Sequence, residues 1–152
     1  MIKRKSLSKK QRLQVYEKTK GHCAYCGIPI EYGQMQVDHV TPFEFAHFVA
    51  AEGGDPNGMD NLLPACRPCN YIKSSLVLEK FRVMASNWPE TLFRDSVTYR
   101  NAVRFGVVVP QHHRVTFYFE KIGLEVKDYM ADLYGKLLTV RERMESEAEN
   151  ES

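Results

Sequence analysis

The sequence predicts an α+β fold: a small two-stranded sheet and a helix tied together by cysteines, with an N-terminal helix and a C-terminal helical extension. Three observations support this prediction. Two C-x-x-C pairs lie at 23–26 and 66–69, and two short apolar runs, 35–40 and 61–66, have the composition of strands. Segments with helical spacing lie on both sides of this region.

The bulk composition suits one domain of ordinary size. The chain has 152 residues, of which 43% are hydrophobic, and this is enough to bury a core. It contains no run of 18 apolar residues, and no apolar segment follows the basic start MIKRKSLSKKQ. These features predict a cytoplasmic protein without a membrane partner.

The small net charge of +2 is unevenly distributed. Residues 1–20 hold eight Lys or Arg against Glu17, a net +7, whereas 141–152 hold two arginines against five glutamates, a net −3. The basic end is typical either of a polyanion-binding segment or of a solvated arm. The acidic end predicts a disordered tail over 142–152.

The first half of the chain alternates helices with short strands. Ser8 and Gly21 bracket a predicted helix whose Leu13, Val15 and Tyr16 can face a core. After the first strand, 42–54 predicts a short helix ending at two glycines. Residues 67–87 have helical composition and form either one helix or two, broken near Ser74 and Ser75.

The second half is predicted to be mostly helical. Pro89 suits the first turn of a helix that ends at Gly106, and 125–144 shows helical spacing of apolar residues. Alternating apolar residues in 115–123 predict a strand. The aromatic and basic residues of this half indicate a core with a solvated rim rather than a nucleic-acid surface; the expected core residues are Trp88, Phe93 and Phe105.

The four cysteines predict a structural zinc site. Each C-x-x-C turn directs two thiolates to one ion, and two turns complete a tetrahedron. Redox or merely buried thiols are the alternative, although a redox motif needs only one pair. The predicted ligands are Cys23, Cys26, Cys66 and Cys69.

The motifs CAYC, VDHVTP, DNLLPAC and CRPCNYIK, in that order, resemble the HNH nuclease family over about residues 20–80. The resemblance implies a zinc-stabilised ββα-metal core, a strand, loop, strand and helix that present a one-metal nuclease site. It divides the chain into a basic arm and helix (1–20), a nuclease core (21–83), a mostly helical extension packed on the core (84–141) and the tail (142–152).

The resemblance also implies roles for individual residues. His39 corresponds to the general base that activates water, and Asp38 and Asn70 correspond to ligands of the catalytic divalent ion. Asn61 corresponds to the asparagine that holds the loop and orients the histidine. Oxygen ligands of this kind suit Mg²⁺ or Mn²⁺.

The chemistry of these residues agrees with the implied roles. An imidazole with a near-neutral pKa suits proton abstraction from water. Neighbouring side chains of a strand point to opposite faces, so Asp38 and His39 can share one phosphate only if the strand bends or ends there. Arg67 and Lys73 flank Asn70 and bind either the substrate backbone or solvent.

The sequence departs from the family's compact loop, because 22 positions separate His39 from Asn61. The excess lies in FEFAHFVAAEGG, which either contacts nucleic acid or packs as a helix. His47 in this insert is more typical of a structural histidine than of a third ligand.

Together these features predict an HNH endonuclease that hydrolyses DNA, by nicking or by double-strand cleavage, in a phage, restriction or mobile-element setting. A zinc-ribbon nucleic-acid-binding or assembly module with an inactive site is the alternative from another functional class. RNA is the alternative substrate, and only the resemblance favours DNA.

Overall fold

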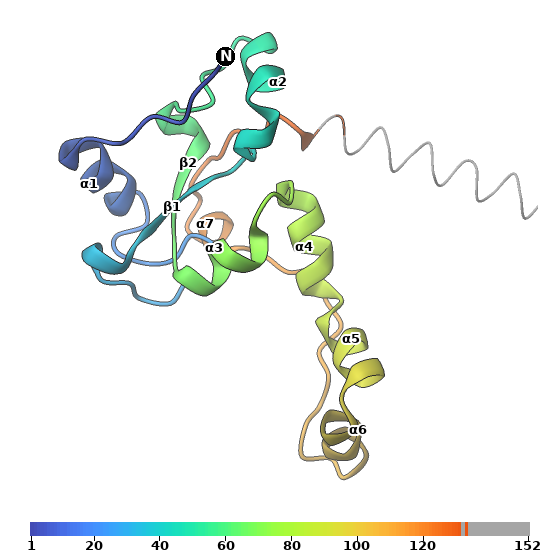
Figure 1. Ribbon diagram of the computed structural model, residues 1–152. Coiled ribbons are helices and arrows are strands. Elements are labelled where there is room, and N and C mark those ends of the chain that lie inside the picture. The colour runs from blue at the N-terminus through green and yellow to red at the C-terminus, as the bar shows by residue number, and fades with distance from the viewer. Residues whose placement is uncertain (132, 134–152) are drawn as a thin grey trace, which may run out of the picture.

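The computed structural model describes residues 1–131 and 133. In this part of the chain a two-stranded sheet lies among short helices, and α5 and α6 extend away from the body of the molecule (Figure 1). The elements in chain order are α1 (Lys9–Glu17), η1 (Tyr32–Gln34), β1 (Gln36–His39), η2 (Phe43–Phe45), α2 (Ala46–Ala51), η3 (Met59–Asn61), β2 (Leu62–Ala65), α3 (Arg67–Lys73), α4 (Leu78–Ser86), α5 (Trp88–Asp95), α6 (Val97–Arg104) and α7 (Tyr118–Lys121). The predicted combination of helices with a small sheet is confirmed.

The predicted N-terminal helix is present as α1. The Ser8 hydroxyl accepts a hydrogen bond from the Gln11 backbone N–H, and the Gln11 side chain accepts one from the Ser8 N–H. This reciprocal cap satisfies donors that a helix start leaves unpaired. Val15 is fully buried and α1 packs on β2, but Leu13, expected to face the core, is exposed.

The two predicted strands pair antiparallel, with Asp38 opposite Leu63 and His39 opposite Leu62. All four residues of β2 are buried, because α1 packs on this strand and the first cysteine turn hydrogen-bonds to it through the Ala24 N–H and the Pro64 carbonyl oxygen, at 2.9 Å. β1 differs, because only Asp38 of its four residues is buried and the other three are half-buried. Asp38 and His39 are the last two residues of β1, so both candidate catalytic residues lie where the strand ends.

The helical segment after β2 is broken at Ser74, as one of the two sequence interpretations predicted. Ser74 has a φ of 46°, a left-handed conformation that ends α3, and α4 begins four residues later at Leu78. Left-handed backbone is costly for a residue with a Cβ, so the surrounding structure must hold it. α3 packs on β1 and brings its residues beside Asp38.

The second half of the chain differs from the prediction in two elements. The helix expected from Pro89 to Gly106 is two helices, α5 and α6, because Ser96 leaves the helical conformation and its hydroxyl caps α6 by accepting from the Tyr99 N–H. The prediction of a strand over 115–123 is wrong. Its middle forms α7, where the Glu120 carboxylate accepts from the Phe117 N–H at 2.7 Å.

Tertiary contacts explain why the alternating pattern of this segment is not a strand. The backbone N–H groups of Tyr118 and Phe119 donate to the carbonyl oxygens of Tyr25 and Ala24, at 3.0 and 2.8 Å. Phe117 and Phe119 both enter the core, although they flank a helix start rather than one face of a sheet. The apolar residues are buried as the pattern suggested, in a different backbone conformation.

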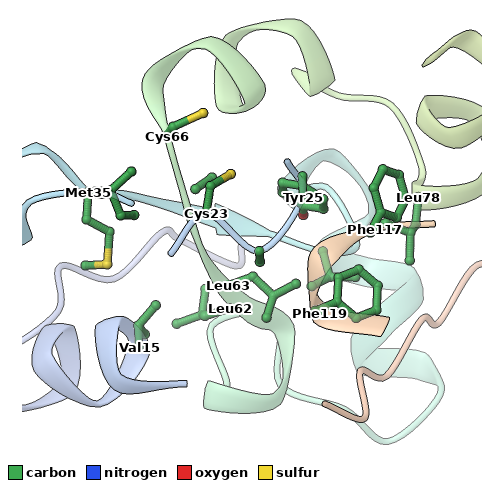
Figure 2. Packing of buried hydrophobic residues seen from close by; sticks show 14 of the residues in the cluster. Val15, Cys23, Tyr25, Met35, Leu62, Leu63, Cys66, Leu78, Phe117 and Phe119 are labelled. Atoms are coloured by element: carbon green, nitrogen blue, oxygen red, sulfur yellow. The ribbon is translucent and has the colours of Figure 1, made fainter. Parts of the chain in front are cut away.

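The core is centred on the sheet, the first cysteine turn and α7 (Figure 2). The Tyr25 ring makes edge contacts with Phe81 and Phe117, with centroids 5.4 and 5.3 Å apart. Each such aromatic pair contributes about 0.5–1.5 kcal/mol beyond burial. Elements far apart in the sequence therefore meet at Tyr25, within the first C-x-x-C turn.

Trp88, Phe93 and Phe105, expected in the core, are 40, 51 and 76% exposed. That expectation was wrong, because α5 and α6 project from the body and pack mainly on each other (Figure 1). The chain returns along α4, where the Val115 N–H donates to the Ser86 hydroxyl at 2.9 Å.

The helix predicted over 125–144 lies mostly, and the tail over 142–152 entirely, outside the described residues. Within the described part, 124–128 are not helical, while Tyr129 and Met130 are buried. Among the residues described, none of the helices has the length and apolar character needed to cross a membrane.

Candidate metal centre and active site

The four predicted zinc ligands meet in space. Their sulfur atoms all lie within 4.8 Å of one another, and the Cys26 and Cys66 sulfurs are 3.8 Å apart. Zinc–sulfur bonds of about 2.3 Å in a tetrahedron place neighbouring sulfurs about 3.8 Å apart, so the cluster fits the ion. All four are free thiols.

The two C-x-x-C pairs are positioned by different local structures. Cys66 is the N-cap of α3 and Cys69 lies in its first turn. Cys23 and Cys26 lie in a tight turn closed by the Gly27 N–H, which donates to the Cys23 carbonyl oxygen at 2.9 Å. Gly27 has a φ of 80°, and a Cβ there would lie 2.8 Å from the Tyr118 ring, so both the turn and its packing require glycine.

Four thiolates within 4.8 Å of one another would repel strongly, so their joint ionisation needs a compensating cation. The Cys69 thiol donates to Cys23 and lowers the pKa of Cys23 to about 4, whereas burial raises the pKa of Cys66 to about 11. A hydrogen bond to Cys23 also raises the pKa of Cys69. A bound dication removes this conflict by stabilising four thiolates together, so the donor set suits zinc.

Asp38 is held through one of its two carboxylate oxygens. The Tyr25 hydroxyl donates to Oδ2 at 2.5 Å, and the Lys73 ammonium lies 2.9 Å from the same atom. No hydrogen bond to Oδ1 is found among residues 1–131 and 133, and Asp38 lines a hollow of about 310 Å³. One oxygen is therefore positioned by the protein, and the other is available to a metal ion.

Burial and the neighbouring charges act oppositely on this carboxylate. Burial raises the pKa of Asp38, while the Lys73 ammonium and the Tyr25 hydroxyl oppose that rise. Burial also raises the pKa of Tyr25 well above its ordinary value, so this residue stays a neutral donor. A dication at Oδ1 would further favour the carboxylate form.

His39 lines the same hollow as Asp38, because β1 ends at His39 and the chain turns away into η2. The Lys73 ammonium donates to the His39 carbonyl oxygen at 2.9 Å and fixes this end of the strand. Burial lowers the pKa of the His39 imidazole, and the charge of Arg4 lowers it further. The neutral imidazole needed by a general base is thus favoured.

Asn61 is fully buried and holds the long loop after β1. Its Oδ1 accepts from the Thr41 N–H at 2.9 Å, and its Nδ2 donates to the carbonyl oxygens of Thr41 and Pro56, at 3.1 and 3.0 Å. Three bonds from one side chain connect both ends of the insert. This arrangement supports the expected role of Asn61 in fixing the segment next to His39.

Asn70 reaches the hollow from α3, opposite the strand that carries Asp38 and His39. His39, the predicted general base, therefore lines the same hollow as Asp38 and Asn70, the predicted ligands of the catalytic ion. The carboxylate of Asp38 and the amide of Asn70 offer oxygen atoms, which suit a hard divalent ion and leave coordination positions for phosphate and water.

The two predicted substrate-binding residues differ. Arg67 is exposed at the start of α3, but Lys73 is fully buried. The position of Lys73 does not fit direct substrate binding, because its ammonium is already occupied by Asp38 and the His39 carbonyl. His47 is exposed on α2 and is not among the residues that line the hollow.

Sequence reasoning missed Tyr25 and Arg4. Tyr25 lies inside the first C-x-x-C motif, so the position was visible but its bond to Asp38 was not. Arg4 lies in the basic N-terminal segment and lines the hollow beside His39. Its charge was visible in the sequence as part of the +7 segment, whereas its location was not.

Comparisons with known proteins agree with this geometry. Residues 23–76 match the family model described as HNH endonuclease. The resemblance to HNH endonucleases is thereby confirmed for this segment. The match begins at the first zinc-ligand candidate and includes Asp38, His39, Asn61 and Asn70.

This HNH segment also has a similar sequence in a larger protein. The chain is 32% identical over 76 residues to the CRISPR-associated endonuclease Cas9 of Corynebacterium diphtheriae, covering 50% of this chain and 6% of that protein. A crystal structure of the Type II-C Cas9 enzyme from Actinomyces naeslundii matches with a TM-score of 0.42 and 28% identity, over 55% of this chain and 9% of that one. The chain therefore spans a small fraction of each relative.

Proposed function

We propose that the protein is a metal-dependent endonuclease that hydrolyses DNA phosphodiester bonds at the hollow between β1 and α3. The observation that carries the proposal is the convergence of Asp38, His39 and Asn70 on that one hollow, next to a cysteine cluster that suits structural zinc. The family match supports a nuclease, and the metal, the base and the DNA substrate are part of the proposal.

In the proposed reaction the neutral His39 imidazole takes a proton from water, and the resulting hydroxide attacks phosphorus. The bond to the 3′-oxygen breaks and that oxygen takes up a proton from solvent water, leaving 5′-phosphate and 3′-hydroxyl ends, while His39 returns its proton to solvent. Mg²⁺ or Mn²⁺, held by Asp38 Oδ1 and Asn70, would neutralise charge on the phosphoryl group and the leaving oxygen. Asn61 keeps the loop after His39 in place through its bonds to Thr41 and Pro56.

One observation favours the alternative of a zinc-stabilised binding or assembly module with an inactive site. The Lys73 ammonium already compensates the Asp38 charge at 2.9 Å, which an idle site would also require. Against this alternative, Lys73 occupies Oδ2 only, and a binding module has no chemical need for His39 and Asn70 at the same hollow.

The test uses supercoiled, linear and single-stranded DNA, and RNA, with added Mg²⁺ or Mn²⁺ or with no added divalent ion. We expect cleavage of DNA only with an added ion. The variant His39→Ala should lose about 10²–10⁴-fold in rate, the usual contribution of a positioned general base, while zinc content and thermal stability stay unchanged.

The matched control is His47→Ala, which removes an exposed imidazole on α2 outside the hollow and should leave the rate unchanged. Full activity of His39→Ala would contradict the mechanism. DNA binding without cleavage under every ion condition would favour the binding module, and preferential cleavage of RNA would correct the substrate.

A further inference from the structure

The basic N-terminal segment is attached to the loop that follows β1. The Lys5 N–H donates to Asn57 Oδ1 at 3.0 Å, and Asn57 Nδ2 donates to the Lys3 carbonyl oxygen at 3.0 Å. Both ends of one side-chain amide thus bind the backbone on either side of Arg4. These two bonds hold the backbone of residues 3–5 against the loop, and so place the Cα of Arg4 beside it.

Asn57 is itself positioned by the structure that supports the active site. Its backbone N–H donates to Asp55 Oδ1 at 2.9 Å, and its neighbour Pro56 accepts a hydrogen bond from the buried Asn61. The asparagine that holds the segment after His39 therefore also holds the loop that carries Asn57. Asn61 thus helps to position both the segment after His39 and, through the loop that carries Asn57, the N-terminal arm.

Arg4 projects into the hollow that contains Asp38, His39 and Asn70. Its guanidinium lies over the Phe43 ring, 5.2 Å from the centroid, and the Phe43 ring lies 5.5 Å from that of His39. Arginine stacked on an aromatic face keeps its N–H edge available for an anion. The guanidinium therefore lies in the same hollow as the proposed general base, next to the aromatic ring that His39 contacts.

The charges around Arg4 favour an external anion as its partner. Asp38 is already paired with Lys73. Glu44, the other acid of the hollow, accepts a hydrogen bond from the Ser75 hydroxyl at 3.0 Å. A hydrogen bond from its own backbone lowers the pKa of Glu44, and the nearby charge of Arg4 helps to lower it without forming an ion pair with it. Arg4 is exposed, and within residues 1–131 and 133 it makes no ion pair with a carboxylate. An exposed guanidinium without a carboxylate partner has the geometry to donate two parallel hydrogen bonds to the oxygens of one phosphate.

We propose that Arg4 is a substrate-binding residue whose guanidinium binds a backbone phosphate of DNA at the hollow, and that Asn57 is the positioning residue that holds it there. The inference rests on the proposed function and assigns a role to the N-terminal arm in the active site. It also selects the polyanion-binding interpretation of the basic segment over the solvated-arm interpretation.

The test measures binding of a fluorescein-labelled DNA duplex by anisotropy without added divalent ion, over a series of salt concentrations. We expect Arg4→Ala to weaken binding about tenfold and to reduce the slope of log K against log salt by about 0.9, the loss of one phosphate contact. Arg4→Lys should recover part of the affinity, because it keeps the charge and loses the bidentate geometry.

Asn57→Ala should weaken binding about threefold, because it releases the arm without removing its charge. The matched control is Arg104→Ala, which removes an exposed guanidinium on α6, far from the sheet in Figure 1, and should change binding less than twofold. Equal losses in Arg4→Ala and Arg104→Ala would overturn the proposal, as would an unchanged Arg4→Ala.

Steady-state cleavage separates this inference from the proposed function. Arg4→Ala should raise KM about tenfold and change kcat less than His39→Ala does. If the wild-type protein binds DNA in the Arg4-dependent way but never cleaves it, the nuclease proposal fails and the Arg4 assignment stands. If it cleaves DNA and Arg4→Ala has no effect on KM or affinity, only the Arg4 assignment fails. A wild-type protein that does not bind DNA overturns both.

Discussion

The core around the cysteine cluster buries its aromatic residues, whereas the projecting helix pair formed by α5 and α6 exposes them. Phe117 at the start of α7 is 2% exposed and contacts Tyr25, Phe81 and Phe119, whereas Phe105 at the end of α6 is 76% exposed. The core brings together segments that are distant in the sequence, while α5 and α6 pack mainly on each other. Residue type alone therefore does not decide whether a side chain is buried. Contacts between segments distant in the sequence decide it.

The largest effect is expected from loss of the cysteine cluster. Cys66→Ala removes one predicted zinc ligand and the N-cap of α3. A structural zinc ion contributes about 10–16 kcal/mol to the folding of small zinc-binding domains. We expect loss of zinc and of cooperative unfolding, measured by metal analysis and by near-ultraviolet circular dichroism during heating. A variant that retains the wild-type Tm without zinc would show that hydrophobic contacts alone hold the core.

A pair of phenylalanine variants tests the comparison directly. Phe117→Ala should lower the free energy of unfolding by about 3–5 kcal/mol, because it leaves a cavity among Tyr25, Phe81 and Phe119. Phe105→Ala should change it by about 0.5 kcal/mol or less, as for an exposed site. Denaturant unfolding measures both changes. Equal losses would mean that Phe105 is buried in solution, and that the helix pair of α5 and α6 packs on another surface.

A pair of tyrosine variants tests the polar contact that connects the cysteine turn with Asp38. Tyr25→Phe removes the donor to Asp38 Oδ2, and a hydrogen bond to a charged group contributes about 1.5–3 kcal/mol. We expect this loss of stability together with weaker Mn²⁺ binding, measured by titration calorimetry.

The control for this pair is Tyr99→Phe on α6, whose hydroxyl makes no hydrogen bond among the described residues. It should leave stability and Mn²⁺ binding unchanged. If Tyr25→Phe lowers stability but leaves Mn²⁺ affinity as it was, Tyr25 supports the fold without positioning the metal ligand.

The smallest expected effect is on the pH dependence of cleavage. Burial and the charge of Arg4 lower the pKa of His39 below its ordinary value of 6.5. The base therefore stays neutral, and activity persists, to lower pH than for a free imidazole. The acidic limb of kcat/KM against pH should therefore lie below that value. Arg4→Ala should move the limb upward, and an unmoved limb would mean that Arg4 does not act on His39.

Much of the site was predictable because its residues lie in compact motifs. The C-x-x-C spacing is a local property, and each pair forms within a turn or a helix start, so the cluster of Cys23, Cys26, Cys66 and Cys69 followed from sequence. Asp38 and His39 also meet the condition stated for them, since β1 ends at His39. Their catalytic roles remain proposals.

The errors arose where tertiary contacts override local patterns. Residues 115–123 alternate like a strand, but bonds from Tyr118 and Phe119 to the cysteine turn draw them into α7. Trp88, Phe93 and Phe105 are residue types typical of a core, yet they stay 40, 51 and 76% exposed, because α5 and α6 pack mainly on each other and not on the sheet. Lysines are usually exposed, but the Lys73 side chain is buried and paired with Asp38.

The sequence by itself determined the cysteine cluster, the two strands and the motif residues, because each depends on spacing over a few positions and on the chemistry of one residue type. Only the tertiary structure decided how the two oxygens of Asp38 are divided, where Arg4 lies and which aromatics are buried. These depend on contacts between residues such as Tyr25, Asp38 and Lys73, and between Asn57 and the N-terminal arm, whose separation along the chain carries no local signal.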